Sequence, residues 1–256
     1  MRRRFYLSPA EWGNEISFSL TGDEAHHCRH VVRAKVGDVF ELIDGQGRSV
    51  PVRVAEFSGK QVEMSPVGES EYQPQKLPLI HLAFAMPKGK NFDLVIQKTT
   101  ELGVDRIIPL ITERTITRPS GKKGALLKKV EKWQRVAIEA TKQCGRRWVP
   151  EISAPLAWND FLTSVEGSVA LLGSLEAESR SLREHLLSSR VKKGDSKTDL
   201  VLAIGPEGDF TRSEYQSAKA AGFLALALGD HILRAETASI AGMTLLAYEF
   251  RPRQFG

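Results

Sequence analysis

The stretch DLVLAIGPEGDF (199–210) decides the fold, together with LGDHILRAETASIAG (228–242) further along the chain. The first is an apolar strand that runs directly into the turn Gly-Pro-Glu-Gly at 205–208. The second sets Arg234 and Glu236 in otherwise apolar sequence, where a core helix would carry Ala or Leu. Two polar corners in apolar sequence indicate a site, and the pattern of strands around them indicates where that site lies.

Three apolar strands in this half of the chain each end in a glycine-bearing turn. They are SVALLGS (168–174), DLVLAIG (199–205) and FLALALG (223–229). In open parallel sheets, ligands bind beyond the carboxyl ends of the strands. Glycine also lets the backbone approach a ligand closely. The turns therefore predict a small-molecule site, although connections between strands and helices use glycine without any ligand, and that structural interpretation stays open.

From about residue 76 onward, apolar strands alternate with helices. LPLIHLAFAM (77–86) is a nearly continuous apolar run, typical of a strand buried on both faces. Thr211 and Glu214 form a capping-box pattern that predicts the start of a helix. Alternating strands and helices indicate an α/β fold with a mostly parallel sheet covered on both sides. The predicted helices cover 91–103, 125–144, 212–222 and 236–250.

The first 70 or so residues have a different, all-β pattern. VFELIDGQGRSVPVRVAEF (39–57) alternates apolar and polar residues on both sides of Asp-Gly-Gln-Gly, which predicts a hairpin. One helical turn is expected within 21–33, and the polar stretch GESEYQPQKLP (68–78), with its two prolines, is typical of a linker. We expect a small β-barrel domain over 1–73 and an α/β domain over 74–256.

Composition narrows the function classes. The chain has 256 residues, ordinary hydrophobic content and no apolar run near the roughly 20 residues of a membrane span. Cys28 and Cys144 are the only cysteines, too few for a disulfide framework or a zinc cage. The amino-terminal MRRRFYLSPAEW lacks the apolar segment of a secretory signal. These features predict a cytoplasmic protein with no membrane association and no metal.

Positive charge is concentrated in the middle of the chain. Residues 76–150 carry a net charge of +10, whereas 1–75 carry −2 and 151–256 carry −3. A local concentration of this kind favours a polyanion such as nucleic acid. A solvated helix face rich in Lys is the alternative.

The familiar cofactor and metal motifs are absent from the sequence. There is no G-x-G-x-x-G, no G-x-x-x-x-G-K-[ST] and no H-E-x-x-H. The cluster His26-His27-Cys28-Arg29-His30 resembles a metal site, but adjacent side chains on a helix cannot all face one ion. Basic and imidazole groups here, and in the Arg2-Arg3-Arg4 cluster, are better suited to phosphate contacts.

Several motifs, in order along nearly the whole chain, carry a family likeness. They are HHCRHVVRAKVGD (26–38), NFDLVIQKTTELGVDRIIPL (91–110), KKVEKWQRVAIEATKQCGR (128–146), LAIGPEGDF (202–210) and LGDHILRAETASIAG (228–242). With them, the chain closely resembles the RsmE-type ribosomal RNA uridine-N3 methyltransferases of the SPOUT superfamily. The pair of IGPEG and LG-x-x-ILR-x-ETA at this spacing is far more specific than a lone glycine loop.

The resemblance implies a PUA-like β-barrel followed by a SPOUT α/β domain whose carboxyl-terminal segment forms a trefoil knot, and a homodimer. It implies methyl transfer from S-adenosylmethionine, leaving S-adenosylhomocysteine, to N3 of a uridine in 16S ribosomal RNA of the small subunit. No metal is needed, because the sulfonium carries its own leaving group. The cofactor site implied comprises Leu172, Gly173, Ile204, Gly205, Glu207, Gly208, Leu228, Gly229, Ile232 and Leu233.

For the chemistry, we assign Arg234 to stabilise negative charge on the uracil O2 and O4 when N3 loses its proton. Glu236 is the candidate general base. Thr237 would hydrogen-bond the base or cap the final helix. The alternative is a buried ion pair between Arg234 and Glu236 that merely joins the preceding turn to the helix.

RNA contacts are expected at basic and polar positions from both halves of the chain. The end of the basic helix would face RNA across the dimer, or would simply place favourable cations at a helix carboxyl end. The predicted RNA-binding residues are Arg3, Arg4, His30, Arg33, Gln143, Arg146 and Arg147.

Two departures from the family pattern stand in the cofactor turns. The family commonly has a second glycine after GPEG, where this chain has Asp209, and some members carry a His-Pro-Arg-like stretch where this one reads GSLEAES (173–179). Two rival functions stay open. One is an RNA-binding or ribosome-assembly protein of the same fold without catalysis. The other is a SPOUT enzyme that methylates transfer RNA or a ribose hydroxyl.

Overall fold

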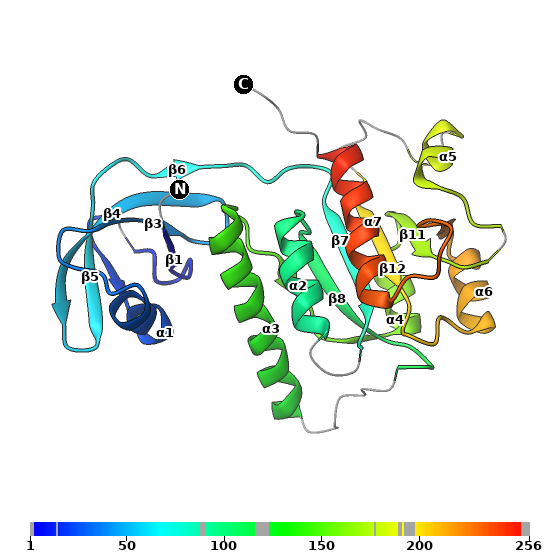
Figure 1. Cartoon of the computed structure of the whole chain (residues 1–256), viewed down its shortest axis with the longest axis horizontal. Helices are drawn as coiled ribbons and strands as arrows, with labels where there is room; N and C mark the ends of the chain where they lie inside the picture. The colour runs from blue at the N-terminus through cyan, green and yellow to red at the C-terminus, as the bar shows by residue number, and fades with distance from the viewer. Residues whose placement is uncertain are drawn as a thin grey trace. The chain divides into compact units, whose positions relative to one another are not determined.

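The computed structural model describes residues 3–13, 15–87, 91–115, 123–176, 178–188, 191 and 198–251. The chain divides into two compact units (Figure 1). The first comprises Met1–Gln75 with Ile138–Val149, and the second comprises Lys76–Ala137 with Pro150–Gly256. The end of the long basic helix therefore belongs to the first unit, which a single boundary between 73 and 74 cannot express. That boundary stays a prediction.

The first unit is built on one six-stranded sheet. β1 pairs with β3 in parallel, and the other pairs are antiparallel. Inward-facing apolar residues alternate with outward polar ones, as the sequence predicts for a half-buried sheet. The path runs β1 (Arg4–Tyr6), β3 (Val39–Ile43), β4 (Arg48–Ser58), β5 (Gln61–Pro66) and β2 (Phe18–Leu20), and β6 (Glu71–Tyr72) pairs with β4.

The predicted hairpin is confirmed, because β3 and β4 pair in register from Val39↔Arg53 to Ile43↔Ser49. The buried carboxylate of Asp44 closes the turn. It accepts hydrogen bonds from the backbone N–H of Gln46 at 2.7 Å and of Arg48 at 2.9 Å.

The predicted helical turn is also present, as α1 (Gly22–His26) followed by a π-helical turn, η1 (His27–Val31). Cys28 is fully buried in the core of this unit, whereas the rings of His26 and His30 lie on the surface 4.7 Å apart. Within this short segment, the thiol therefore belongs to the core and the two imidazoles belong to the surface.

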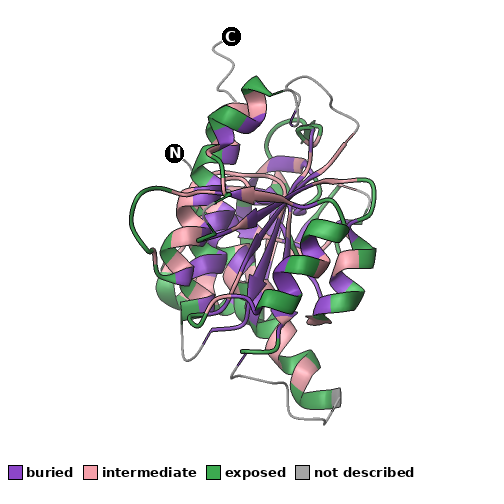
Figure 2. Ribbon diagram, turned by 90° about the vertical axis from the view of Figure 1, so that its right-hand side faces the viewer, coloured by how far each residue is buried: buried purple, intermediate pink, exposed green. Residues whose placement is uncertain are grey.

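The second unit contains the predicted parallel sheet. Every strand pair in it is parallel. Figure 2 shows these strands almost wholly buried between helices. The order is β10 (Leu156–Ala157), β8 (Arg106–Ile111), β7 (Ile80–Ala85), β12 (Leu200–Ile204), β11 (Val169–Gly173) and β13 (Leu224–Leu226), and β9 (Glu151–Ile152) pairs with β8.

Six helices are described in the rest of the chain, four of them at predicted positions. The capping box is confirmed, because Thr211 accepts from Glu214 N–H and the Glu214 carboxylate accepts from Thr211 N–H. The short helices α4 and α5 had no prediction. The helices are α2 (Asn91–Glu101), α3 (Lys123–Cys144), α4 (Trp158–Ser164), α5 (Leu182–Leu187), α6 (Arg212–Ala220) and α7 (Ala235–Phe250).

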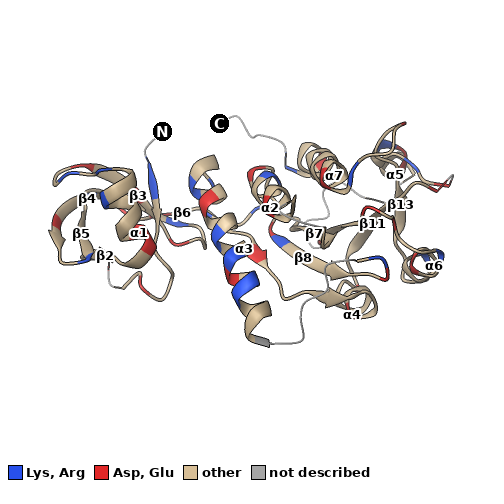
Figure 3. Ribbon diagram, turned by 60° about the horizontal axis from the view of Figure 1, so that its bottom comes forward, with Lys and Arg blue, Asp and Glu red and all other residues tan. Residues whose placement is uncertain are grey.

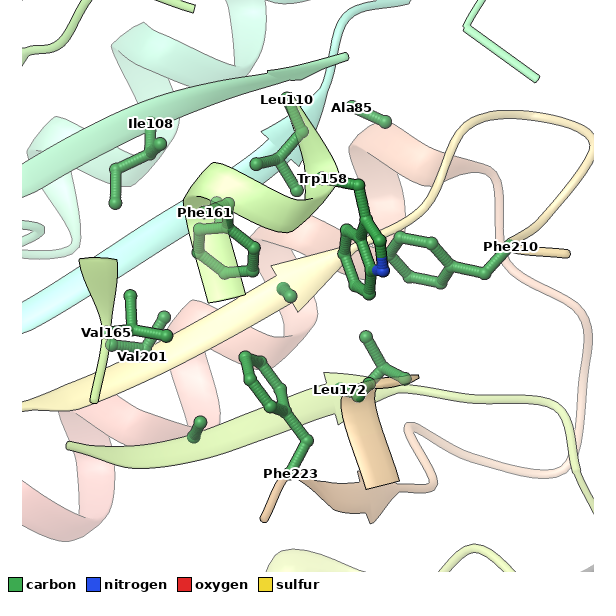
Figure 4. Close-up of a cluster of buried hydrophobic side chains, with 14 of the residues drawn as sticks. Ala85, Ile108, Leu110, Trp158, Phe161, Val165, Leu172, Val201, Phe210 and Phe223 are labelled. Carbon is green, nitrogen blue, oxygen red and sulfur yellow. The ribbon is translucent and has the colours of Figure 1, made fainter. Parts of the chain in front are cut away.

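Successive residues of β12 face different helices, because side chains alternate along a strand. Val201 and Ala203 face a cluster that holds Trp158 and Phe161 of α4 (Figure 4). Leu202 faces the other side, where α7 packs. A Cβ atom at Gly242 would lie 2.5 Å from Leu202 Cδ2, so only glycine allows α7 this close to the sheet.

Candidate cofactor and catalytic site

The three predicted glycine-bearing turns meet at one cavity of about 440 Å³ in the second unit. Because β11, β12 and β13 are parallel, the turns that follow them lie at one edge of the sheet. A volume of this size is within the range of small-molecule sites. The lining residues are 173–175, 204–207, 209, 228, 229, 231–236 and 238, with Asn91 from the start of α2.

Most of the predicted cofactor residues are brought together here. Leu172 is instead buried in the core behind the cavity, and Gly208 lies on an exposed part of its turn; neither lines the cavity. Their contact with a cofactor, like that of the others, stays a prediction. The predicted residues that line the cavity are Gly173, Ile204, Gly205, Glu207, Leu228, Gly229, Ile232 and Leu233.

The glycines of the three turns line the cavity, and the local structure also requires glycine at these positions. A Cβ at Gly173 would lie 2.6 Å from Ile204 Cδ1, and one at Gly205 would lie 3.0 Å from Phe210 Cδ2. Gly229 has a φ of +136° and no atom within 4 Å of an added Cβ. Two of the turns therefore need glycine for packing and the third for its backbone conformation, and all three leave an open backbone wall.

The turn after β12 is held by several hydrogen bonds. Asp209 adopts a left-handed φ of 61°, and its carboxylate accepts from the backbone N–H of Phe210 at 2.8 Å. The hydroxyl of Tyr215 donates to the same carboxylate at 2.9 Å. The guanidinium of Arg114 donates to the carbonyl of Gly208 and, at 3.5 Å, to that of Phe210.

Of the three predicted catalytic residues, Arg234 and Glu236 line the cavity and Thr237 does not. Arg234 is the exposed N-cap residue of α7, with an extended backbone at φ −62° and ψ 151°. Glu236 lies in the first turn of α7 and accepts a hydrogen bond from Asn91 Nδ2 at 3.3 Å. Thr237, also in that turn, is exposed.

The alternative of an Arg234–Glu236 ion pair is not what the structure contains. Within the described part of the chain, no salt bridge joins these two side chains. Arg234 faces the cavity from the helix start, and Glu236 is engaged by an amide rather than by a guanidinium. Both charged groups are thus available to a ligand.

Sequence reasoning missed other lining residues. His231 and Asp209 were visible in the quoted motifs but carried no assigned role. Asn91 opens a quoted motif but had no assigned role either, because its place beside Glu236 depends on the packing of α2 on α7, 145 positions apart.

The seven predicted RNA-binding residues all belong to the first unit. Arg4 forms a salt bridge with Glu41 at 2.6 Å, and Arg147 forms one with Glu71 at 2.6 Å. A guanidinium N–H of Arg4 also donates to the carbonyl of Arg146 at 3.1 Å. The remaining four, Arg3, His30, Arg33 and Gln143, are exposed. Their contact with RNA stays a prediction, and Arg2 lies outside the described residues.

Lys and Arg residues recur along α3 (Figure 3), and they differ in burial. Lys128, Lys132 and Arg135 are exposed, whereas Lys142 is buried and pairs with Glu24 at 2.5 Å and with Glu139 at 2.7 Å. The four-carbon stem of Lys142 packs in the first unit while the ammonium finds carboxylate partners.

No group of His, Cys, Asp or Glu among the described residues is arranged to hold a metal ion. No helix among those residues has the length and apolar content to cross a membrane.

Family models match both parts of the chain. An RNA methyltransferase domain matches residues 74–247, and an RNA methyltransferase PUA domain matches residues 20–66. The parallel α/β sheet, the cavity at its carboxyl edge and the preceding β-domain are therefore those of an RNA methyltransferase.

Relatives specify the family further. The Synechocystis ribosomal RNA small subunit methyltransferase E is 36% identical over 88% of this chain and 70% of its own length. The Bacillus subtilis protein of that name is 28% identical over 91% of this chain and 90% of its own. The chain belongs to the ribosomal RNA small subunit methyltransferase E family.

Two solved structures share the whole fold. A Legionella pneumophila protein with the cofactor SAM bound superposes with a TM-score of 0.86 at 31% identity, over 97% of this chain and 98% of that one. The Neisseria gonorrhoeae ribosomal RNA small subunit methyltransferase E, bound to S-adenosyl methionine, gives 0.83 at 28% identity, over 98% of both chains.

Proposed function

We propose that this protein transfers a methyl group from S-adenosylmethionine to N3 of a uridine in 16S ribosomal RNA. The observation that carries the proposal is the meeting of three glycine-bearing turns with Arg234 and Glu236 at one cavity, in a chain of this family. Relatives of the same fold bind the same cofactor. A knotted carboxyl-terminal segment, expected from the resemblance, belongs to this proposal.

The cavity suits the cofactor in size and in chemistry. Ile204, Leu228 and Leu233 offer apolar contacts, and the glycine turns offer exposed backbone N–H and C=O groups. The carboxylates of Glu207 and Asp209 make part of the wall negative, which favours a cationic ligand. When bound, the sulfonium supplies an activated methyl group, so the protein need only position an acceptor in line with it.

Arg234 and Glu236 have the chemistry that the acceptor requires. Loss of the N3 proton spreads negative charge onto the uracil O2 and O4, which a guanidinium stabilises through paired donors. Arg234 is exposed at the cavity rim, where a base can reach it. Glu236 is the candidate to remove the proton, and Asn91 orients its carboxylate. Thr237, exposed in the first turn of α7 between two residues that line the cavity, is the candidate to hydrogen-bond the base.

We assign RNA binding mainly to the first unit and to α3, with the small ribosomal subunit as the partner. A homodimer in the cytoplasm completes the proposal. Exposed apolar side chains on the second unit, Ile232 at 81% and Tyr248 at 78%, are consistent with a further protein surface covering them.

The test is methyl transfer from labelled S-adenosylmethionine to purified small subunits that lack the modification. Label recovered as 3-methyluridine supports the proposal. Label in another nucleoside would show that a different position is methylated. Preferential labelling of transfer RNA would show that transfer RNA is the substrate. An absence of any label from wild-type protein would favour a binding protein that has lost catalysis.

A further inference from the structure

The hydroxyl of Tyr215 lies beside the turn that follows β12, which forms one wall of the cavity. Tyr215 belongs to α6, and its side chain is largely buried against Phe210, with ring centroids 5.8 Å apart. Its hydroxyl lies 2.9 Å and 3.0 Å from the two carboxylate oxygens of Asp209. A phenol has one proton to donate, so it is shared between these two acceptors.

Burial raises the pKa of Tyr215, with Asp209 acting in the same direction, to about 12. The phenol therefore keeps its proton throughout the physiological range, as a donor to Asp209 must.

Asp209, which accepts these bonds, lines the cavity from the turn after β12. Tyr215 itself does not line this cavity, so it acts through the residue that it holds.

This contact falls at one of the two departures from the family pattern, because Asp209 stands where a glycine is common. A left-handed backbone costs little for glycine and more for aspartate. The bonds from Phe210 N–H and Tyr215 hold Asp209 at its φ of 61° despite that cost.

We infer that Tyr215 is a positioning residue, which directs the carboxylate of Asp209 at the wall of the cofactor cavity. The inference rests on the proposed function for the identity of that ligand. Arg114 binds the carbonyls of Gly208 and Phe210 from the other side of the turn, so the turn keeps its shape when the phenol is removed. What changes is the direction of the Asp209 carboxylate at the cavity wall.

The first experiment is calorimetry of the full-length protein with S-adenosylmethionine. Tyr215→Phe removes only the hydroxyl, and we expect the Kd to rise about fivefold to tenfold, because a carboxylate in the cavity wall loses its donor. Asp209→Asn should weaken binding less, since its amide oxygen still accepts. Ser217→Ala is the matched control. Ser217 is on the same helix as Tyr215, and its hydroxyl accepts a 2.8 Å hydrogen bond from Trp158 away from the cavity. This variant should leave Kd unchanged.

Steady-state kinetics separate positioning from a purely structural role. For Tyr215→Phe we expect KM for the cofactor to rise with the Kd while kcat at saturation stays within about twofold. A merely structural bond would lower the melting temperature and leave KM and Kd of the folded protein at their wild-type values, which would overturn the inference.

A double-mutant cycle tests the pair from its other partner. Asp209→Gly also removes the left-handed strain, so this variant is expected to fold even if Tyr215→Phe does not. The two substitutions together should weaken binding by little more than either alone, within about twofold, because both delete the same bond. Effects that multiply independently would contradict the pairing. Wild-type protein that binds no cofactor would refute the proposed function itself, whereas wild-type binding with an unchanged Tyr215→Phe refutes only the inference.

Discussion

Asn91, the first residue of α2, donates a hydrogen bond from its side-chain amide to the carboxylate of Glu236 in the first turn of α7, at 3.3 Å. Both residues line the cavity. The bond fixes the direction of a carboxylate that would otherwise rotate freely on an exposed helix start. It gives Glu236 one of the features of a general base, an oriented acceptor beside the expected site of the reacting nitrogen.

Replacing Glu236 with Gln should therefore lower kcat for methyl transfer by roughly 10²- to 10⁴-fold, since a positioned base contributes about that much. Cofactor affinity should hardly change. Asn91→Ala, which leaves the carboxylate in place but unoriented, should cost less than Glu236→Gln. Single-turnover rates with saturating cofactor measure both effects. If Asn91→Ala were the more damaging change, Asn91 rather than Glu236 would contact the base.

Arg234→Ala should lower kcat by roughly 10²- to 10³-fold, the usual cost of removing a donor that stabilises developing negative charge. Arg234→Lys keeps the charge but loses the planar pair of donors, so its activity should fall between that of the wild type and that of Arg234→Ala. The measurement is the rate of label transfer to unmodified small subunits. Equal rates for wild type and Arg234→Ala would remove this residue from the chemistry.

Gly173→Ala should weaken cofactor binding and lower stability together. The added methyl would lie 2.6 Å from Ile204 Cδ1, so a cavity wall must shift, and overpacking of this kind costs about 1–3 kcal/mol. Calorimetry and urea unfolding measure the two effects. Gly124→Ala in α3 is the control, because nothing lies within 4 Å of its added Cβ. It should stabilise the helix by up to about 1 kcal/mol and leave binding alone.

RNA binding should depend on salt through the exposed cations of the first unit. Arg33 has a left-handed φ of 55°, so Arg33→Asn removes its charge with a residue that tolerates this conformation. We expect weaker RNA binding. The plot of log affinity against log salt concentration should have a slope that is shallower by about 0.7–0.9, which corresponds to the loss of one phosphate contact. Filter binding at several salt concentrations measures this slope. An unchanged slope would exclude Arg33 from the interface.

Stability should fall in mild acid partly through His81 on β7. Burial lowers the pKa of His81 below its usual 6.5, although Asp199 at 3.4 Å acts in the opposite direction. The unfolded chain then takes up the proton more readily, so this contribution is present above about pH 6.5 and is lost as pH falls through the folded pKa.

His81→Gln should accordingly lose less unfolding free energy than wild type between about pH 7.5 and pH 5, as measured in urea. His26→Gln, at an exposed position, should behave like wild type. A variant curve parallel to that of wild type would show that His81 is not the group that couples stability to pH.

Local sequence pattern determined the parts of the fold that depend on near neighbours. Alternation gave the hairpin around Asp44, apolar runs gave the buried strands, and the Thr211–Glu214 pair gave the start of α6. Because parallel strands end at one edge, the three glycine turns predicted the place of the cavity. The short strands and helices β9, β10, α4 and α5 were missed, since two to seven residues are too few to show a period.

Tertiary structure decided which side chains meet. It buried Lys142 against Glu24, placed Asn91 on Glu236 and left Thr237 outside the cavity. None of these contacts has a signature in the sequence, because each depends on the approach of segments separated by many residues. Periodicity reports which face of an element is buried, whereas the partner across that face is set by how whole elements pack.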